Sequence, residues 1–393
     1  MEKAKILKDV SFITTVFNEE KSVLLFLESL VSQTLMPEEI VIVDGGSDDN
    51  TLNLIIEYFS KISGSSSLKK KISINGIVYY EKEVPFHGIY NSDKSHTASY
   101  IPEKLVFETF LACGTDVKIF YAPFTKISQG RNIAIKNSTA KFICVSDGGC
   151  RLKPNWLYEI TKYYFFDFIK KTDEYDLDVT GGYNLPYIKK FLHAVLSMCI
   201  LPKKSEIDKR KFMPSSRNIS FKRKVWEAVG EYPEYMDYGE DMKFNFNLKN
   251  AGYKIEFNPD AHIYWNLRDN LNSVFKQFFR YSKGDAIGRM YSYRHIIRFF
   301  SFFVFLIIVS ASAVLSPWYL LLLVPLFIFY SYRPYSRINY ILNNQQMGEF
   351  VKNKKNLNVY KVLSIFSIPL LLLYIDAAKL SGYFYGLAFW KKY

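Results

Sequence analysis

Residues 39–46 read EIVIVDGG, a short run of strand-forming residues that ends in an aspartate and two glycines. Such a run predicts a buried strand, and the glycines permit a tight exit because they lack the Cβ that restricts backbone turns. The arrangement recurs at residues 143–150, which read ICVSDGGC. Asp44 and Asp147 are therefore both expected at the carboxyl ends of strands.

The sequence around these two runs alternates between strand and helix patterns. Strands are expected over residues 10–16, 39–43, 117–121 and 141–145, with helices over 20–33, 50–59 and about 132–136. This rhythm predicts an α/β fold with a mixed, mostly parallel sheet flanked by helices, and with ligands beyond the carboxyl ends of the strands. The pattern breaks at about residues 63–115, where we expect an insertion that forms a small hairpin or a mobile flap. Its two histidines, His87 and His96, are irregularly spaced and are expected at the surface.

Two common nucleotide-binding motifs are missing from the chain. No GxGxxG follows the first strand and no GxxxxGK[ST] occurs, so the dinucleotide-binding and P-loop classes lose their main support. Asp44 could accept hydrogen bonds from the base or ribose of a nucleotide, or it could belong to a plain turn and cap. Asp147 could likewise be a cap or a ligand of a divalent cation, which prefers oxygen ligands.

Three further stretches place polar residues on predicted helices, two of them at the helix start. Residues 128–132 (SQGRN) open a helix whose N-terminus, with Arg131, could contact phosphate or hold Asp147 in place. Glu240 and Asp241 open a helix that runs to about residue 250, where acids are either caps or a general base. Residues 270–290 predict an amphipathic helix with Gln277 and Arg280 on its polar side.

The basic excess of the chain lies mainly at its C-terminal end. Lys and Arg number 51 against 38 Asp and Glu, a net charge of +13, and residues 296–393 carry +8 of it. The same region holds the uncharged runs 299–315 and 318–332, which together fit a membrane hairpin, and a third apolar run within 362–376 that either crosses the membrane or lies shallow. A buried helical subdomain is the alternative. Nucleic-acid binding is disfavoured because the remaining chain carries only +5 and has no recognition motif.

Five segments, in this order, resemble glycosyltransferase family 2 and its GT-A fold. They read TTVFNEEKSV from residue 14, VIVDGGSDDNT from 41, GRNIAIKNSTAKFICVSDGGCRLKPNWL from 130, GEDMKFNFNLKNAG from 239 and KQFFRYSKGD from 276. The resemblance implies catalysis by Asp241, the base of an acid pair with Glu240. It implies nucleotide-sugar binding by a larger set: Thr15, Phe17, Asn18, Glu19, Asp44, Gly130, Arg131, Asn132 and Asp147.

The resemblance also implies an acceptor or diphosphate element and a metal. Gln277, Arg280 and Tyr281 are similar to the QxxRW element of membrane-associated synthases, with tyrosine in place of tryptophan. Asp147 would be the first acid of a DxD-like element that binds Mn²⁺ or Mg²⁺, with His262 as a late ligand. The second acid of that element is missing, because Gly148, Gly149 and Cys150 follow Asp147.

These observations predict an inverting glycosyltransferase in the cell membrane, multi-pass, with a cytoplasmic catalytic domain. Residues 1–290 would form the GT-A domain, and residues 291–393 a membrane region with the hairpin 299–332 and the third segment 362–376. The enzyme would move a sugar from a nucleotide-diphosphate sugar to a hydroxyl of a lipid-linked or glycan acceptor, in polysaccharide or glycolipid biosynthesis. The alternatives are a processive polysaccharide synthase and a catalytically silent nucleotide-sugar-binding scaffold.

Overall fold

The computed structural model describes residues 5–63, 69–74, 77–81, 104–165, 177–344, 347–352 and 356–389. The chain divides into two compact units, each of which is described by itself. Unit 1 comprises Met1–Asn184 and Asp208–Tyr264, and unit 2 comprises Leu185–Ile207 and Trp265–Tyr393. Residues 82–103, with His87 and His96, lie outside the described residues.

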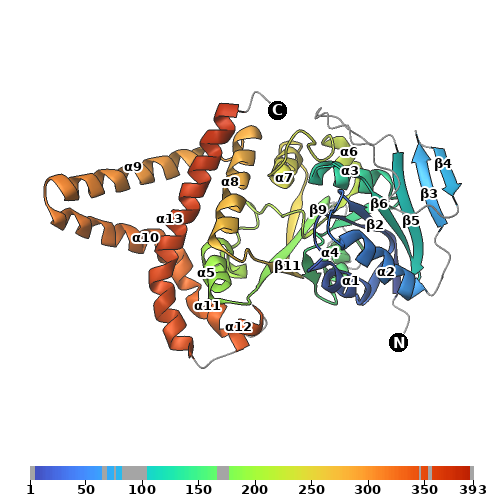
Figure 1. The fold of residues 1–393 in the computed structure, drawn as a ribbon, viewed down its shortest axis with the longest axis horizontal. Helices are drawn as coiled ribbons and strands as arrows, with labels where there is room; N and C mark the ends of the chain where they lie inside the picture. The colour runs from blue at the N-terminus through green and yellow to red at the C-terminus, as the bar shows by residue number, and fades with distance from the viewer. Residues whose placement is uncertain are drawn as a thin grey trace. The chain divides into compact units, whose positions relative to one another are not determined.

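Unit 1 is built on one mixed sheet with helices on both of its faces (Figure 1). The order of the eleven described strands is β4-β3-β5-β6-β2-β1-β7-β10-β9-β11-β8. Their bounds are β1 Lys5–Val16, β2 Leu35–Asp44, β3 Lys69–Ile74, β4 Ile77–Glu81, β5 Lys104–Ala112, β6 Thr115–Tyr121, β7 Phe142–Val145, β8 Cys150–Leu152, β9 Val179–Tyr187, β10 Ile219–Lys222 and β11 Ile255–Asn266. The helices are α1 Val23–Val31, α2 Thr51–Ser63, α3 Ile127–Lys136, α4 Trp156–Phe165, α6 Arg223–Ala228 and α7 Glu240–Asn250.

The parallel part of the sheet consists of its four central strands. β6, β2, β1 and β7 run in the same direction, with Val16 opposite Asp44 and Ile13 opposite Val145. The strands on either side, among them β5 and β10, pair antiparallel to this centre. The predicted mixed sheet is therefore confirmed, and its parallel strands place the expected binding edge at the ends of β1, β2 and β7.

Alternating side chains of β1 explain the layers above and below the sheet. Phe12 points to the face covered by α1 and α4, where its ring meets those of Phe26 and Trp156 at centroid distances of 6.1 and 5.8 Å. Ile13 points to the opposite face and packs in a buried cluster with residues of α3, α6 and α7. This alternation is the period of two that a buried strand imposes.

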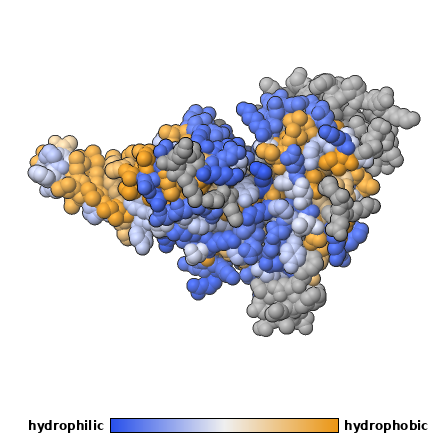
Figure 2. Space-filling model, turned by 90° about the horizontal axis from the view of Figure 1, so that it is seen from below, coloured by the Kyte–Doolittle hydropathy of each residue, from blue (hydrophilic) through white to orange (hydrophobic). Residues whose placement is uncertain are grey.

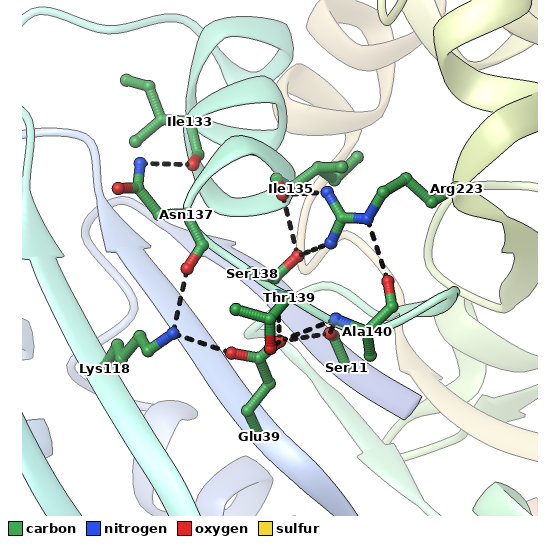
Figure 3. A network of polar contacts seen from close by, with 10 residues as sticks. All are labelled: Ser11, Glu39, Lys118, Ile133, Ile135, Asn137, Ser138, Thr139, Ala140 and Arg223. Atoms are coloured by element: carbon green, nitrogen blue, oxygen red, sulfur yellow. Dashed lines mark hydrogen bonds and ion pairs between the residues drawn. The ribbon is translucent and has the colours of Figure 1, made fainter. Parts of the chain in front are cut away.

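A buried carboxylate fastens the loop between α3 and β7 to the sheet (Figure 3). Glu39, whose side chain is 3% exposed, accepts hydrogen bonds from Ser11 Oγ at 2.6 Å and from the amide nitrogens of Thr139 and Ala140. It also pairs with Lys118 Nζ at 2.8 Å. Burial alone would raise the pKa of Glu39, but these donors and Lys118 lower it to about 2.

Beside it, the Arg223 guanidinium holds the end of α3 (Figure 3). Nη1 donates to the carbonyl oxygen of Ile135 at 2.6 Å, Nη2 to Ser138 Oγ at 2.7 Å and Nε to the carbonyl oxygen of Ala140 at 2.9 Å. The orphan carbonyls of a helix C-terminus need such donors, and cations suit that end of the helix dipole. The network fixes where α3 sits on the sheet, and α3 carries Arg131.

The described part of the expected insertion is an extension of the sheet. β3 pairs antiparallel with both β4 and β5, and β5 continues antiparallel onto β6. These strands lie at the β4 end of the strand order, on the far side of β2 from β7.

Unit 2 is helical apart from the last residues of β9 and β11, which belong to it. Its elements are α5 Phe191–Ile200, η3 Lys204–Glu206, α8 Leu271–Ile287, α9 Ser292–Val314, η4 Pro317–Leu322, α10 Leu323–Ser336, α11 Ile338–Asn343, α12 Glu349–Lys352 and α13 Leu357–Phe389. α9, η4 and α10 form the predicted hairpin, and hydrophobic side chains cover the surface of that hairpin (Figure 2).

Two of the described helices, α9 and α13, are long and apolar enough to cross a membrane. The apolar 18-residue stretch of α9 is not buried within the protein at all, whereas 28% of the corresponding stretch of α13 is buried. This supports membrane association, but two such helices do not support the expected multi-pass arrangement.

Candidate active site

The candidate site of unit 1 lies where the central parallel strands end. β1 is followed by Phe17, Asn18 and Glu19, β2 ends at Asp44, and Asp147 follows β7. Because parallel strands present their carboxyl ends at one edge, segments far apart in the sequence meet there.

Asp44 is fully buried, and only one of its carboxylate oxygens has a partner among the described residues. Oδ1 accepts hydrogen bonds from the amides of Gly46 at 2.8 Å and Ser47 at 2.7 Å, while Oδ2 accepts none. Burial raises the pKa of this carboxyl, although the two amides oppose the shift. Gly46 has φ +94 and a Cβ there would meet Pro123, so the turn requires glycine. An unpartnered buried oxygen is costly to the protein alone and suits a ligand donor.

The loop after β1 is joined to the loop after β2. Asn18 lies in the left-handed region at φ 55. Its side-chain Oδ1 accepts a hydrogen bond from the backbone N–H of Asp48 at 3.0 Å, and its backbone N–H donates to Ser47 Oγ at 3.0 Å. The Phe17 side chain is 58% exposed, and its ring would lie 3.8 Å from a Cβ at Gly45. An exposed aromatic ring thus sits beside the turn that holds Asp44.

Arg131 connects two of the other predicted acidic residues, Asp147 and Glu240. Its side chain is 3% exposed; Nη2 donates to Asp147 Oδ1 at 2.9 Å and Nη1 to Glu240 Oε1 at 2.7 Å. The guanidinium also lies over the Tyr232 ring, 5.3 Å from the centroid. One buried cation from α3 therefore fixes both the loop after β7 and the first residue of α7.

The pKa values of the two acids are displaced in opposite directions. Burial would raise the pKa of Asp147, but Arg131 and Arg217 hold it below its usual range. Burial, reinforced by the charge of Asp241, raises the pKa of Glu240 well above its usual range in spite of Arg131. Paired acids whose environments separate their pKa values in this way are common at functional sites.

Asp241 is less buried than Glu240 and points to different partners. Its Oδ2 lies 3.3 Å from Ser215 Oγ, and its Oδ1 accepts the amide of Met242 at 2.8 Å. Successive residues of a helix are rotated by about 100°, so the two acids cannot face the same way. Glu240 faces Arg131, which leaves Asp241 as the carboxylate that is not held by that cation.

Three predicted ligand-binding residues have packing roles in this unit. A Cβ at Gly130 would lie 2.8 Å from Thr15 Cγ2, so Gly130 lets α3 approach β1. Asn132 is 1% exposed, and its amide bonds the backbone of Tyr232 through both Nδ2 and Oδ1, at 2.9 and 3.0 Å. These contacts occupy Asn132 with protein groups and help to place Arg131.

A carboxylate lies next to Gly149, the position at which the DxD-like element lacks its second acid. A Cβ at Gly149 would lie 3.1 Å from both carboxylate oxygens of Glu19, so an aspartate at this position would have to displace Glu19. Burial and the negative charges of Asp147 and Glu19 raise the pKa of the Cys150 thiol. The Glu19 carboxylate, from the loop after β1, therefore lies beside the segment that follows Asp147.

His262 lies on β11, where its backbone and its ring each make a contact. Its carbonyl oxygen accepts the amide of Lys153 at 3.1 Å, and its ring centroid lies 6.1 Å from that of Tyr183. Within the described ranges, no group of three or more His, Cys, Asp and Glu is arranged to hold a metal ion. Metal ligation by Asp147 and His262 stays a prediction.

The predicted acceptor element lies in unit 2, on α8. Gln277 Nε2 donates to the hydroxyl of Tyr281 at 2.9 Å, one helical turn away. Gln277 is 6% exposed and Tyr281 37%. The role expected for these two residues and Arg280 also stays a prediction.

Sequence reasoning missed two residues that contact the acids. Arg217 Nε lies 3.4 Å from Asp147 Oδ2, and Ser215 contacts Asp241. Both belong to the segment SSRN at 215–218, which has no periodicity and matches no motif that marks a site. The antiparallel pairing of β10 with β7 brings this segment beside Asp147.

Known families and structures share features with this chain. Residues 11–73 match the family described as "Glycosyl transferase family 2", and residues 204–332 match "Glycosyl transferase family group 2". No curated protein matches the sequence. The structure is similar to that of a mannosyltransferase, PcManGT from Pyrobaculum calidifontis, in complex with GDP-Man and Mn²⁺. The two structures compare with a TM-score of 0.52 at 12% sequence identity, and the match covers 95% of this chain and 87% of the PcManGT chain. TarS 1–349 of S. aureus in complex with UDP-GlcNAc gives a TM-score of 0.42 at 14% identity, over 98% and 91%.

Proposed function

Because this chain is a glycosyltransferase of family 2 with a GT-A fold, we propose that it transfers a sugar with inversion from a nucleotide-diphosphate sugar to an acceptor hydroxyl. The observation that carries the proposal is the Arg131 bridge between Asp147 and Glu240. That bridge draws a strand-end acid and the start of the helix with Asp241 into one site.

The donor nucleotide would bind at the end of β2. Asp44 Oδ2, buried and without a described partner, can accept a hydrogen bond from an N–H of the base or a hydroxyl of the ribose. The exposed ring of Phe17 offers the base a stacking surface beside it. Both groups are held by the bonds that join the loops after β1 and β2.

A divalent cation, Mn²⁺ or Mg²⁺, fits this site with few protein ligands. Asp147 is 29% exposed on its side chain and retains lone pairs beyond those that face Arg131 and Arg217, and Glu19 places a second carboxylate beside Gly149. Mg²⁺ is commonly bound by one or two carboxylates together with substrate phosphates. When bound, the cation would neutralise charge on the leaving diphosphate.

In the proposed inverting reaction, Asp241 and Glu240 have different roles. The acceptor oxygen attacks the anomeric carbon from the side opposite the diphosphate while Asp241 takes the hydroxyl proton. The bond from that carbon to the diphosphate oxygen breaks, and the nucleoside diphosphate leaves. Glu240 does not take the proton, because it is buried against Arg131 and braces the start of α7. General-base assistance of this kind contributes about 10²–10⁴-fold to rate.

We infer that the acceptor is a lipid-linked or glycan molecule at the cytoplasmic face of a membrane. The support is the exposed apolar surface of the α9–α10 hairpin, in which Phe303, Leu306 and Phe329 are 52, 50 and 86% exposed. An exposed apolar patch of this kind marks an interaction surface rather than a water-facing one.

The test uses the full chain purified in detergent. Nucleotide sugars are screened by thermal shift with and without Mn²⁺, and the donors that bind are then assayed for transfer and hydrolysis. We expect at least one donor to stabilise the protein and to turn over, and Asp241→Asn to bind it without turnover. Binding with no turnover by the parent would instead identify a silent nucleotide-sugar-binding scaffold, and no binding of any donor would refute the proposed substrate class.

A further inference from the structure

Helix α13 of unit 2 is apolar enough to cross a membrane, but it is longer than a membrane span needs to be. Its 33 residues extend over about 50 Å at about 1.5 Å per residue, whereas a bilayer core is about 30 Å thick. Asp376 and Lys379 lie past the middle of this helix. Ionisable side chains are costly at mid-membrane depth.

The C-terminal half of α13 packs closely along α8. The Tyr374 hydroxyl donates to the carbonyl oxygen of Leu271 at 3.1 Å, and its ring lies 5.6 Å from that of Phe275. Further along, Gly382 and Gly386 lie against the backbone of α8, where a Cβ would collide with Phe279 and Lys283. α8 also carries Lys276, Arg280 and Asp285, so a helix that follows it over this length is not surrounded by lipid.

The middle of α13 is fastened to the base of the hairpin. Arg298, just before the uncharged run of α9, pairs through Nε with Asp376 Oδ1 at 2.8 Å. The hydroxyl of Tyr330, near the end of the second uncharged run, bonds the other oxygen of Asp376. Tyr335, where α10 leaves that run, donates to the carbonyl oxygen of Ile365 at 3.0 Å. The hairpin leaves α13 near the middle of that helix (Figure 1).

These contacts set the relative depths of the two elements. If the apolar hairpin is in the bilayer, its base lies at the bilayer surface, and the middle of α13 lies at that same depth. Asp376 and Ile365, far apart along α13, contact Tyr330 and Tyr335, which lie close together at the end of α10, so α13 passes across the base of the hairpin and not along it. A span centred on α13 is therefore incompatible with an inserted hairpin.

One face of α13 is nevertheless apolar and exposed. Val362, Phe366 and Leu370 recur every four residues and are 54, 67 and 68% exposed. Phe384, 50% exposed, continues this stripe and contacts Phe299 at the start of the hairpin, with ring centroids 5.9 Å apart. A helix with one buried face and one exposed apolar face suits the interface between headgroups and acyl chains.

We propose that α13 lies in the surface of the bilayer, parallel to its plane, with its exposed stripe against lipid, while the α9–α10 hairpin enters the same leaflet. The inference rests on the proposed membrane insertion of the hairpin. It makes the described membrane region monotopic, with both ends of α13 on the same side of the membrane. The third apolar segment, 362–376, thus lies shallow and does not cross.

The experiment introduces one cysteine at a time into the full chain and labels it in sealed inside-out membrane vesicles with a membrane-impermeant maleimide. The parent carries Cys113→Ser and Cys199→Ser, because Cys113 is exposed and Cys199 partly exposed, whereas Cys144 and Cys150 are buried. Asn358→Cys and Ala388→Cys mark the two exposed ends of α13. We expect both to react without permeabilisation. Labelling of only one end until detergent is added would show that α13 crosses and would overturn the inference.

Depth is then measured with a spin label at Phe366→Cys. We expect the spin label to be more accessible to oxygen than to a water-soluble nickel chelate. This would place the label about 5–10 Å below the bilayer surface. Full accessibility to the chelate would show that the stripe faces water and would also overturn the inference. Leu315→Cys, at the hairpin tip, is the separate control for insertion. If it reacts as fast in intact vesicles as in detergent, the hairpin is not inserted and the proposed membrane location fails with the inference. If it is protected, the location stands whatever α13 does.

Discussion

Replacing Asp241 with asparagine tests the proposed general base with little change of shape. The amide keeps an oxygen that can accept the Met242 amide, now 2.8 Å away, and a group that can bond Ser215 Oγ, now 3.3 Å away. We therefore expect the free energy of unfolding to change by no more than about 1 kcal/mol. The amide cannot take a proton at neutral pH. Turnover should fall by about 10²–10⁴-fold, which raises the barrier by about 3–5 kcal/mol.

Glu240→Gln is the matched control, because Glu240 is the adjacent acid. Its carboxylate is 8% exposed and bonds Arg131 Nη1 at 2.7 Å. The glutamine oxygen can still accept from Arg131, so the change removes charge and not the contact. A hydrogen bond between a charged pair is worth about 1.5–3 kcal/mol and a neutral one about 0.5–1.5, so unfolding should become easier by about 1–2 kcal/mol. Loss of the repulsion with Asp241 offsets part of this cost.

The assay measures single-turnover transfer at saturating acceptor, donor affinity by calorimetry and thermal unfolding on the same preparations. Asp241→Asn should lose turnover with donor affinity within a few-fold of the parent, since the base meets the acceptor and not the diphosphate. Glu240→Gln should lose stability with a smaller loss of turnover. If Asp241→Asn turns over within a few-fold of the parent, the reasoning is refuted. An acceptor that is already ionised, such as a lipid phosphate, would then explain the reaction.

Four further outcomes follow from the contacts of unit 1. Asp44→Asn places an amide where the buried Oδ2 lies, so calorimetry should show about 10–100-fold weaker donor binding, the loss of one charged hydrogen bond; unchanged affinity would remove Asp44 from the donor site. The stabilisation by Mn²⁺ with donor present, read by thermal shift, should disappear in Asp147→Asn, and EDTA should abolish transfer by the parent. Arg131→Met leaves Glu240 without its cation and Asp147 with Arg217 alone, and should cost about 3–5 kcal/mol of unfolding free energy in denaturant titrations. The pKa of Glu39 is about 2 in the folded protein against an ordinary value of 4.5, so its stabilisation of about 3 kcal/mol is present above pH 4.5 and is lost as pH falls toward 2. Glu39→Gln should flatten the stability profile over that window, and an unchanged profile would contradict the network.

The parallel centre of the sheet of unit 1 could be predicted because its signals are local. Apolar runs at 10–16, 39–43, 117–121 and 141–145 all became strands, since a buried strand needs continuous apolar residues and glycine allows its tight exit. The helix that begins at Glu240 was also predicted within a residue. The antiparallel flanks were not predicted, because β9, β10 and β11 pair with strands distant in the sequence.

The third apolar segment shows where hydropathy stops being informative. Residues 362–375 carry no charge, and composition alone could not say whether they cross a membrane or lie shallow. The answer depends on which side of the helix is already covered by α8, and on the pairing of Asp376 with Arg298. Both are tertiary contacts, to which a window average is blind.

The site itself was predictable as a set of residues but not as an arrangement. Arg131, Asp147 and Glu240 each begin or end a predicted element, yet Arg131 and Glu240 are 109 positions apart. The sequence left open whether Arg131 contacts phosphate or holds Asp147, and the 2.9 and 2.7 Å contacts answer in favour of holding both acids. A cation committed to two carboxylates has little charge left for a diphosphate. The neutralisation of the leaving group must then come from elsewhere, which is why Glu19, beside the glycine that replaces the second acid, matters to the proposed cation.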